Sequence, residues 1–329
     1  IDYTTGEGVV LLEPQSTNLI EYSNDYADAY WIKATSGSGI APIVTSNYAI
    51  SPDGTQNADR IQFDATTSGS NADRSRIRTT LSLTDTSYYT FSFYAKSTDG
   101  TDQNIGVLFD NSQIGTFTIT YEWQRFEATQ QQFGTSSICG LDLRGGSAST
   151  SDILVYGIQI EQQSYATSYI PTSGAIATRL ADSLTGAGDA TTFNSTEGVL
   201  YVEMAALTDG GSNRYISLLN GTHRISILFR TLSGRIRVDG TSFSVIEAQG
   251  IPQDNNNKIA VSYSSSGVKL FVNGVLEDSN TDNPNFPTNS LSSLDFELNG
   301  TLPLYGKVKA LAVFNEALTD SELECLTKI

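Results

Sequence analysis

The chain has one histidine and 36 acidic residues, a number that alone cannot exclude paired carboxylates, but these side chains form no recognisable catalytic motif. The single histidine, His223, lies in a stretch with no nucleophile motif around it. The nearest approach to a glycosidase-like carboxylate pair is Asp295 with Glu297, and Glu203 lies on another stretch. Carboxylates two residues apart share one face of a strand, which is either a site or a solvated surface. We therefore expect no enzymatic activity.

Aromatic side chains beside polar ones are better suited to sugar binding. A sugar ring presents an apolar C–H face and a rim of hydroxyl groups, so aromatic platforms and amide, carboxylate or guanidinium groups bind it. In residues 88–96, alternation places Tyr89, Phe91 and Phe93 on one face and a mixed set of Tyr, Thr and Ser on the other. For each candidate aromatic ring, packing in a core or at its rim remains the alternative. The candidates for carbohydrate binding are Tyr30, Trp31, Tyr88, Tyr94, Trp123 and Arg125.

The composition favours strands and excludes two classes of partner. Charged residues make up 17% of the 329 residues, against roughly a quarter in an average globular protein. Ser, Thr, Asn and Gly, which are unfavourable in helix interiors, take the place of charged residues. The 16 Tyr and 14 Phe favour strands. A formal net charge of −17 repels phosphate, so we expect no nucleic acid partner. No apolar run is long enough to insert in a membrane.

Short alternating stretches separated by turn residues recur along the chain and predict strands. In the first half they are residues 88–96, 114–129 with a turn near Glu122, and 152–162. The Asn273-Gly274 pair predicts a type I′ hairpin. This spacing of strands and turns is typical of β-sandwiches and jelly rolls. The second-half strands are predicted at 198–207, 224–230, 234–240, 258–264, 268–277, 293–300 and 306–315.

Helix signals are sparse. Thr319 with Glu322 three residues on forms a capping box, which predicts one short C-terminal helix. A shorter helical turn is expected within residues 23–31, capped by Asn24 or Asp25. The two cysteines, Cys139 and Cys325, match no disulfide scaffold or zinc spacing, and we expect two buried free thiols.

The chain is expected to contain two β domains. Small residues and little alternation between 165 and 193 mark the boundary. The domains are predicted at 18–171 and 190–329, with a leading arm at 1–17 and a connector at 172–189. The first residue is Ile1 rather than Met, and we expect an upstream segment.

The first half resembles the jelly-roll carbohydrate-binding-module domain that is common in bacteriophage tail and other virion proteins. The stretches EPQSTNLIEYSNDYADAYWIK, YYTFSFYAKS and YEWQRFEAT carry the resemblance in order over residues 11–180, and Trp123 with Arg125 forms its Trp-x-Arg feature. The closing stretch is the most specific, with Gly157, Gln159 and Glu161 before Tyr-Ile-Pro-Thr. Such modules also occur in secreted polysaccharide-degrading enzymes.

The second half resembles a concanavalin A-like, laminin-G-like lectin domain. The stretches TEGVLYVEM, NGTHRISILFR, NKIAVSYSSSGVKLFVNGV and GKVKALAVFNEALTDSELECLT carry this resemblance. It implies a second β-sandwich. It does not imply a function, because lectins, glycanases, adhesins and structural modules share this fold.

Together the resemblances imply a non-enzymatic virion surface or tail-appendage protein, at the virion surface or otherwise extracellular. Its partners would be host-surface glycans, further copies of itself, for instance in a trimer, or other virion proteins. Jelly-roll modules of this kind often hold a structural Ca²⁺, for which the resemblance implicates Glu21 and Glu161. Two alternatives stay open: binding modules of a secreted polysaccharide-degrading enzyme, and a structural spacer or capsid decoration that binds no sugar.

Overall fold

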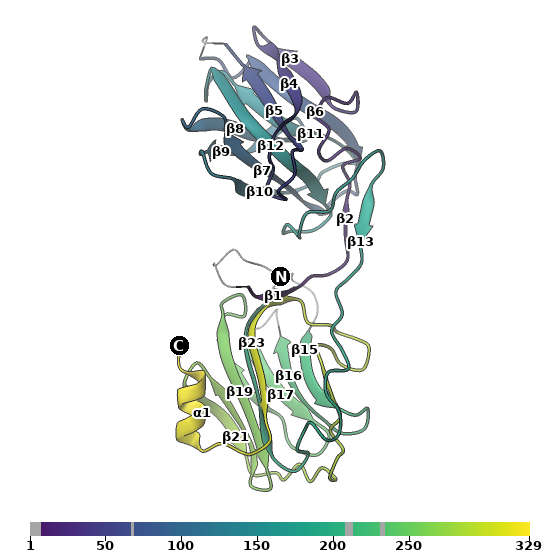
Figure 1. Cartoon of the computed structure of the whole chain (residues 1–329), viewed down its shortest axis with the longest axis vertical. Helices are drawn as coiled ribbons and strands as arrows, with labels where there is room; N and C mark the ends of the chain where they lie inside the picture. The colour runs from purple at the N-terminus through teal and green to yellow at the C-terminus, as the bar shows by residue number, and fades with distance from the viewer. Residues whose placement is uncertain (1–7, 67–68, 208–212, 231–233) are drawn as a thin grey trace. The chain divides into compact units, whose positions relative to one another are not determined.

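The computed structural model describes residues 8–66, 69–207, 213–230 and 234–329 (Figure 1). These residues form strands almost throughout, with one short helix among them near the C-terminus, so the all-β prediction is confirmed. The chain divides into two compact units. Gln15–Leu180 is called the jelly-roll unit below, and Ala181–Ile329 with the residues up to Pro14 is called the C-terminal unit. None of the described helices has the length and apolar character needed to cross a bilayer.

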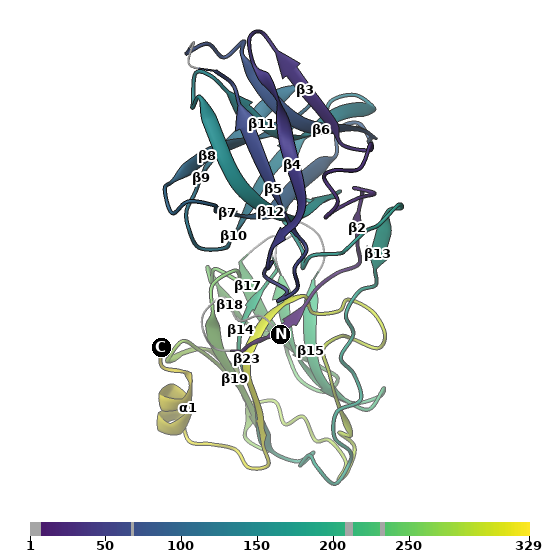
Figure 2. The same ribbon diagram turned by 45° about the horizontal axis from the view of Figure 1, so that its top comes forward.

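The jelly-roll unit is a sandwich of antiparallel sheets (Figure 2). Within its described residues, one sheet has the order β10-β7-β12-β5-β4 and the facing sheet has the order β3-β6-β11-β8-β9. The strands are β3 (Ile32–Ser36), β4 (Ile40–Ala49), β5 (Ala58–Asp64), β6 (Arg74–Ser82), β7 (Tyr88–Ser97), β8 (Gln103–Phe109), β9 (Ser112–Ile119), β10 (Gln124–Gln131), β11 (Ser136–Arg144) and β12 (Thr150–Glu161).

The order of the strands is that of a jelly roll. From β5 to β12 the chain crosses from one sheet to the other at most steps, so that β12 lies between β5 and β7 while β11 lies between β6 and β8. Inward-facing apolar side chains fill the space between the sheets, among them Trp31, Ile77, Phe91 and Phe93. The alternation predicted for residues 88–96 is confirmed, because Tyr89, Phe91 and Phe93 are all buried.

The C-terminal unit is also a sandwich of antiparallel sheets, as its alternating stretches predicted. Within its described residues the sheets have the orders β1-β23-β14-β19-β20-β21 and β18-β17-β16-β15-β22. The strands are β1 (Val10–Leu12), β14 (Gly198–Ala206), β15 (Arg214–Leu219), β16 (Arg224–Arg230), β17 (Arg235–Gly240), β18 (Ile246–Gln249), β19 (Asn257–Ser264), β20 (Gly267–Val272), β21 (Val275–Asn280), β22 (Ser293–Asp295) and β23 (Gly306–Phe314).

The helix α1 (Asp320–Thr327) covers the outer face of the sheet that contains β14 and β19. Leu323 is fully buried there, against Tyr201, Ala260 and Phe271. The predicted capping box is confirmed, because the Thr319 side chain accepts a hydrogen bond from the N–H of residue 322 and the glutamate side chain bonds back to the Thr319 N–H. The helix thus begins where its sequence signal predicted.

The expected leading arm and connector are each divided between the two units. Residues 1–7 lie outside the described residues, whereas β1 pairs with β23 at the edge of a sheet of the C-terminal unit. Further on, β2 (Ser16–Asn18) pairs with β13 (Ala177–Arg179) in the jelly-roll unit. The division in the connector falls after Leu180. Pairing satisfies backbone groups that a free arm would leave to water.

Some local predictions are confirmed and others are wrong. Asn273 and Gly274 both have positive φ between β20 and β21, as a type I′ hairpin requires. The strand expected at 293–300 ends at Asp295, and residues 23–31 form turns instead of a helix, although the Asp25 side chain accepts the N–H of residue 28. Both cysteines are free, but Cys325 is exposed because it lies on the solvent side of α1.

Candidate functional site

The outer face of the sheet β10-β7-β12-β5-β4 carries several of the predicted sugar-binding residues, but part of it is covered. Arg125 Nη2 donates to Ser92 Oγ at 3.0 Å and to the Thr167 carbonyl at 2.5 Å. The Thr90 hydroxyl donates to the Gln163 carbonyl at 2.9 Å. Thr90 and Ser92 are fully buried, although they point away from the core. The segment after β12 that contains Gln163 and Thr167 therefore covers the half of the face around Thr90 and Ser92. We call it the covering segment.

Arg125 and a series of packed tyrosine rings hold the covering segment in place. The Arg125 guanidinium lies 5.5 Å from the Tyr94 ring centroid, and the Tyr94 ring lies 6.0 Å from that of Tyr156. Tyr169 packs on Tyr156 at 5.1 Å and lies over Gly157, where a Cβ would come within 3.2 Å of the Tyr169 ring. Tyr94 and Arg125, predicted as sugar-binding residues, are thus engaged in internal contacts.

We expect Arg125→Met to lower the stability of the jelly-roll unit. The change keeps much of the aliphatic stem but removes the donor to the Thr167 carbonyl and the cation beside Tyr94. Loss of charged hydrogen bonds of this kind costs about 1.5–3 kcal/mol, which chemical unfolding followed by tryptophan fluorescence would measure. Arg125→Lys is expected to recover only a part, because an ammonium cannot reproduce the fork of a guanidinium. Full stability of Arg125→Met would contradict this role.

The other half of the face is open and aromatic. The Lys96 ammonium lies 5.0 Å from the Tyr121 ring centroid and 5.9 Å from that of Trp123. The Trp123 indole N–H donates to the Ile50 carbonyl at 3.2 Å. Tyr121 is 55% exposed and Ile50 is 62% exposed, so this end of the face is accessible to a ligand.

A row of residues in register links this end of the face to the edge of the sheet, although Leu154 at its centre is buried. Leu154 of β12 pairs in register with Lys96 of β7 and with Arg60 of β5, which makes one transverse row. The Arg60 guanidinium lies 5.2 Å from the Tyr48 ring centroid, and it pairs with Asp152 through two hydrogen bonds. We call the connected set the aromatic patch; its members are Tyr48, Ile50, Arg60, Lys96, Tyr121 and Trp123.

The remaining predicted aromatic residues lie outside this patch. Trp31 is 1% exposed and its indole N–H donates to the Tyr22 carbonyl at 2.8 Å, so it is a core side chain with no face for a sugar. Tyr30 is half-buried edge-on against Trp31, with ring centroids 5.5 Å apart. Tyr88 is 51% exposed, but it precedes Lys96 by eight residues on the same strand, about 26 Å at roughly 3.3 Å per residue.

Of the six patch residues, sequence reasoning predicted only Trp123. Lys96 continues the alternating series from Tyr88, and Tyr121 precedes Trp123 by two residues, so both could have been found from the strand period. Tyr48 has no such signal. Its place beside Arg60 depends on the pairing of β4 with β5, in which the register shifts between Thr45 and Ala49.

The two candidate calcium ligands lie in different surroundings. Glu161 is fully buried, and its carboxylate accepts hydrogen bonds from Ser16 Oγ, Gln163 Nε2 and both the N–H and Oγ1 of Thr167. Glu21 is exposed, and its backbone carbonyl accepts the N–H of Gly174. Within the described residues, no group of three or more His, Cys, Asp or Glu side chains could hold a metal ion. Calcium binding by Glu21 and Glu161 stays a prediction.

The acidic residues considered for catalysis in the C-terminal unit are held in separate local contacts. Asp295 accepts the Gly186 N–H at 2.7 Å, and Glu297 accepts the Gly300 N–H at 2.7 Å in the turn after β22. Glu203 accepts from Asn256 Nδ2 at 2.6 Å. Because β22 ends at Asp295, the expected sharing of one strand face by Asp295 and Glu297 is wrong.

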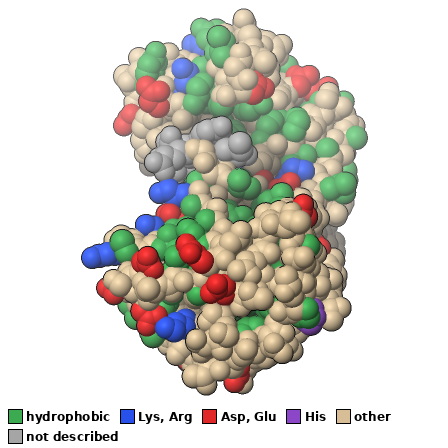
Figure 3. All heavy atoms as spheres, turned by 60° about the horizontal axis from the view of Figure 1, so that its bottom comes forward, with side chains coloured by type: hydrophobic (Ala, Val, Ile, Leu, Met, Phe, Trp, Pro, Cys, Tyr) green, Lys and Arg blue, Asp and Glu red, His purple; other side chains and the backbone are tan. Residues whose placement is uncertain are grey.

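The single histidine lies at the surface of the C-terminal unit, as the purple side chain in Figure 3. His223 is half-buried, with its ring centroid 5.7 Å from that of Phe286. The backbone N–H of His223 donates to Asn220 Oδ1 at 2.7 Å in the turn between β15 and β16. On the face seen in Figure 3, acidic side chains are spread among neutral groups. These contacts hold His223 in a surface turn.

The family comparison concerns the C-terminal unit. Residues 190–324 match the concanavalin A-like lectin/glucanases superfamily. This match agrees with the two antiparallel sheets of that unit, so its sandwich has a lectin-like fold. A search of curated proteins found no match to the chain.

Solved structures of sugar-binding domains are similar in outline. Domain 4 of AbnA, a GH43 extracellular arabinanase from Geobacillus stearothermophilus, in complex with arabinotriose, is 22% identical, with a TM-score of 0.35 over 50% of this chain and 81% of that chain. The CBM22-1–CBM22-2 tandem domain of Xyn10C from Paenibacillus barcinonensis is 10% identical, with a TM-score of 0.32 over 92% of this chain and 99% of that chain. At such scores the likenesses carry no weight for function.

A buried aspartate joins two loops of the jelly-roll unit beside the aromatic patch. Asp59 is 1% exposed; its Oδ2 accepts the Tyr26 N–H at 3.0 Å and its Oδ1 accepts the Asn47 N–H at 2.8 Å. Burial raises the pKa of this carboxyl to about 6, against the lowering effect of the two N–H donors and of Lys33; the charge of Asp25 adds to the rise. The side chain therefore changes charge near pH 6.

We expect wild type to gain stability relative to Asp59→Asn as the pH falls from 7 to 4.5. The folded-state pKa of about 6 exceeds the unfolded value of about 3.9. The ionised form is thus disfavoured in the folded state, and its cost disappears as the pH falls through 6. The difference in Tm should move in favour of wild type by about 2–4 °C, the effect of about 1 kcal/mol in a domain of this size. A difference that does not vary with pH would contradict the raised pKa.

Proposed function

We propose that this chain is a non-enzymatic glycan-binding protein that contacts polysaccharide through the aromatic patch. The observation that carries the proposal is the row of rings and polar groups from Tyr48 to Tyr121, in which both tyrosine rings are exposed. On the other half of the face, the polar groups are engaged in internal hydrogen bonds. Apolar ring faces stack on the C–H faces of sugars, while Lys96 and the paired Arg60 supply hydrogen-bond donors to hydroxyl groups. The lectin-like fold of the C-terminal unit supports a role in carbohydrate recognition.

The biological setting that we propose is a virion surface or tail appendage, where the protein contacts host-surface glycans. Its support is the resemblance of residues 11–180 to virion jelly-roll modules, together with an acidic surface that disfavours nucleic acid. Self-association, for instance as a trimer, belongs to the same proposal. Light scattering coupled to size-exclusion chromatography would measure the mass of the protein in solution. A monomer at all concentrations would contradict the proposed self-association.

Affinity electrophoresis of the full chain tests glycan binding. Native gels would contain neutral polysaccharides such as glucans, galactans, mannans and arabinans, or acidic ones with uronic acids. We expect at least one polysaccharide to retard the protein, and free oligosaccharide of the same kind to reverse the retardation. Unchanged mobility in every gel, together with no signal on a bacterial glycan array, would overturn the proposed function.

A further inference from the structure

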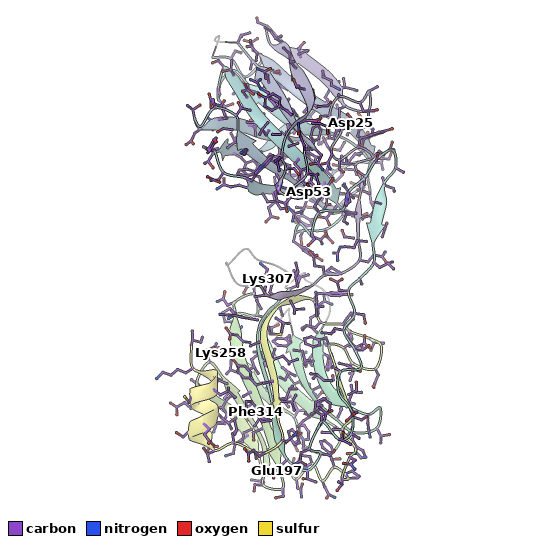
Figure 4. The ribbon with its side chains drawn as sticks, viewed as in Figure 1. Asp25, Asp53, Glu197, Lys258, Lys307 and Phe314 are labelled. Carbon is purple, nitrogen blue, oxygen red and sulfur yellow. The ribbon has the colours of Figure 1, made fainter. Side chains whose placement is uncertain are left out.

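The jelly-roll unit holds a polar pocket that shares no lining residue with the aromatic patch. Its volume is about 480 Å³, within the range of roughly 300–1,000 Å³ that ligand pockets occupy. Asp25, labelled in Figure 4, is one of its wall residues. The wall is formed mainly by Tyr22, Asn24, Asp25, Asn47, Asn57 and Asp59.

Hydrogen bonds between distant segments hold this pocket open. Asp59 on β5 binds the backbone N–H groups of Tyr26 and Asn47, so that it joins the segment before β3 to the loop end of β4. Asn24 Oδ1 accepts the Gly157 N–H at 2.8 Å, which ties the same segment to β12. The Ser23 N–H donates to Thr172 Oγ1 at 3.1 Å and fixes the remaining wall. The pocket is therefore preformed, which lowers the entropic cost of binding.

The chemistry of the wall selects the kind of ligand. Two carboxylates, Asp25 and Asp59, line the pocket, and no Lys or Arg is among its lining residues. The nearby Lys33 ammonium is bonded to the backbone carbonyls of Ala27 and Asp28. An anionic ligand would thus meet like charge without a counter-charge on the wall. Asparagine amides and the Tyr22 ring offer what a neutral polyol needs: donors, acceptors and an apolar face.

One wall group lacks a partner. The Oδ1 atom of Asn57 is buried and has no hydrogen-bond partner among the described residues, while its Nδ2 donates to Asp53 at 3.0 Å. A buried acceptor without a donor is costly, so the Asn57 amide is not fully satisfied by the protein's own groups. A metal ion fits less well, because both Asp59 oxygens already accept backbone N–H groups and no carboxylate-rich metal group occurs in the described residues.

We propose that this pocket binds a single neutral sugar unit, such as a terminal hexose, as a second site distinct from the aromatic patch. The inference rests on the proposed function in taking a sugar as the ligand. The pocket would bind the terminal sugar unit of a glycan chain, whereas the aromatic patch would bind units along the chain. A protein with both sites would hold a polysaccharide at two points, and its binding to the polymer would exceed that of either site alone.

Side-chain amide signals in NMR spectra of the full chain test the pocket directly. Titration with glucose, galactose, mannose and N-acetylglucosamine is expected to shift the Asn47 and Asn57 side-chain amides for at least one sugar, and glucuronate is expected to shift neither. Ser46, an exposed lining residue on β4, offers a blocking variant. Ser46→Trp should abolish the shifts, and Ala41→Trp, at another exposed position of β4, should leave them.

These experiments distinguish a failure of the pocket inference from a failure of the proposed function. If no neutral sugar shifts these amides while polysaccharide still binds and Trp123→Ala weakens that binding, the pocket inference is overturned and the proposed function stands. If Ca²⁺ shifts the amides and sugars do not, the pocket is a cation site and the inference is also overturned. If no polysaccharide or array glycan binds but a neutral sugar still shifts the amides in a manner that Ser46→Trp blocks, the pocket stands and the role of the patch is overturned.

Discussion

Trp123→Ala is expected to weaken polysaccharide binding by at least about tenfold. The indole is half-buried beside the Lys96 ammonium, and its N–H is fixed on the Ile50 carbonyl, so the ring is held in place before a ligand arrives. Aromatic side chains of this kind are frequent hot spots, for which truncation costs more than about 1–2 kcal/mol, and about 1.4 kcal/mol is tenfold in affinity. Isothermal titration with the polysaccharide found by electrophoresis would measure the change.

Two tyrosines provide a matched pair for the same experiment. Tyr121 and Tyr88 are 55% and 51% exposed, so their truncation alters a similar amount of surface. Tyr121 contacts the Lys96 ammonium within the patch, whereas Tyr88 lies at the far end of β7 opposite Gln131. We expect Tyr121→Ala to weaken binding several-fold and Tyr88→Ala to leave it unchanged. Equal effects of the two variants would show that the ligand lies along the whole strand instead of on the patch.

The sequence was a good guide to the sheets because strand patterns are local. A period of two in residues 88–96 was enough to predict which side chains of β7 enter the core, and Asn273-Gly274 was enough to predict its hairpin. Thr319 and Glu322 similarly specify where α1 begins. Each of these signals depends on residues a few positions apart.

The candidate site was harder to predict because exposure depends on residues far along the chain. From the sequence, Arg125 was a reasonable residue for binding a sugar. In the structure it donates instead to the carbonyl of Thr167, which lies 42 residues later in the chain. Trp31 was a candidate for sugar binding with core packing as the alternative, and its burial between the sheets shows that packing is its role. Conversely, Tyr48 joins the patch only through Arg60 of the neighbouring strand. A sequence pattern predicts the face of a strand but not what covers that face.

Glu161→Ala is expected to destabilise the jelly-roll unit by about 3 kcal/mol or more. Its carboxylate is fully buried and accepts four hydrogen bonds, which join the start of the unit at Ser16 to the covering segment at Gln163 and Thr167. Hydrogen bonds to a charged group contribute about 1.5–3 kcal/mol each, and removal of the acceptor leaves the donors unsatisfied in the interior. At about 2–4 °C per kcal/mol, Tm should fall by about 6–12 °C.

Fluorescence would isolate this effect, because both tryptophans, Trp31 and Trp123, lie in the jelly-roll unit. Glu21→Ala is the matched control: its side chain is exposed and its contact with Gly174 uses the backbone carbonyl, so Tm should change little. Unfolding with Ca²⁺ and with a chelator separates hydrogen bonding from metal binding. If Ca²⁺ raised the Tm of wild type and both variants lost that increase, Glu161 would be a calcium ligand together with Glu21, and the hydrogen-bonding role would be overturned. A Tm that is independent of Ca²⁺ but falls only in Glu161→Ala would establish the carboxylate as the internal fastening of the covering segment.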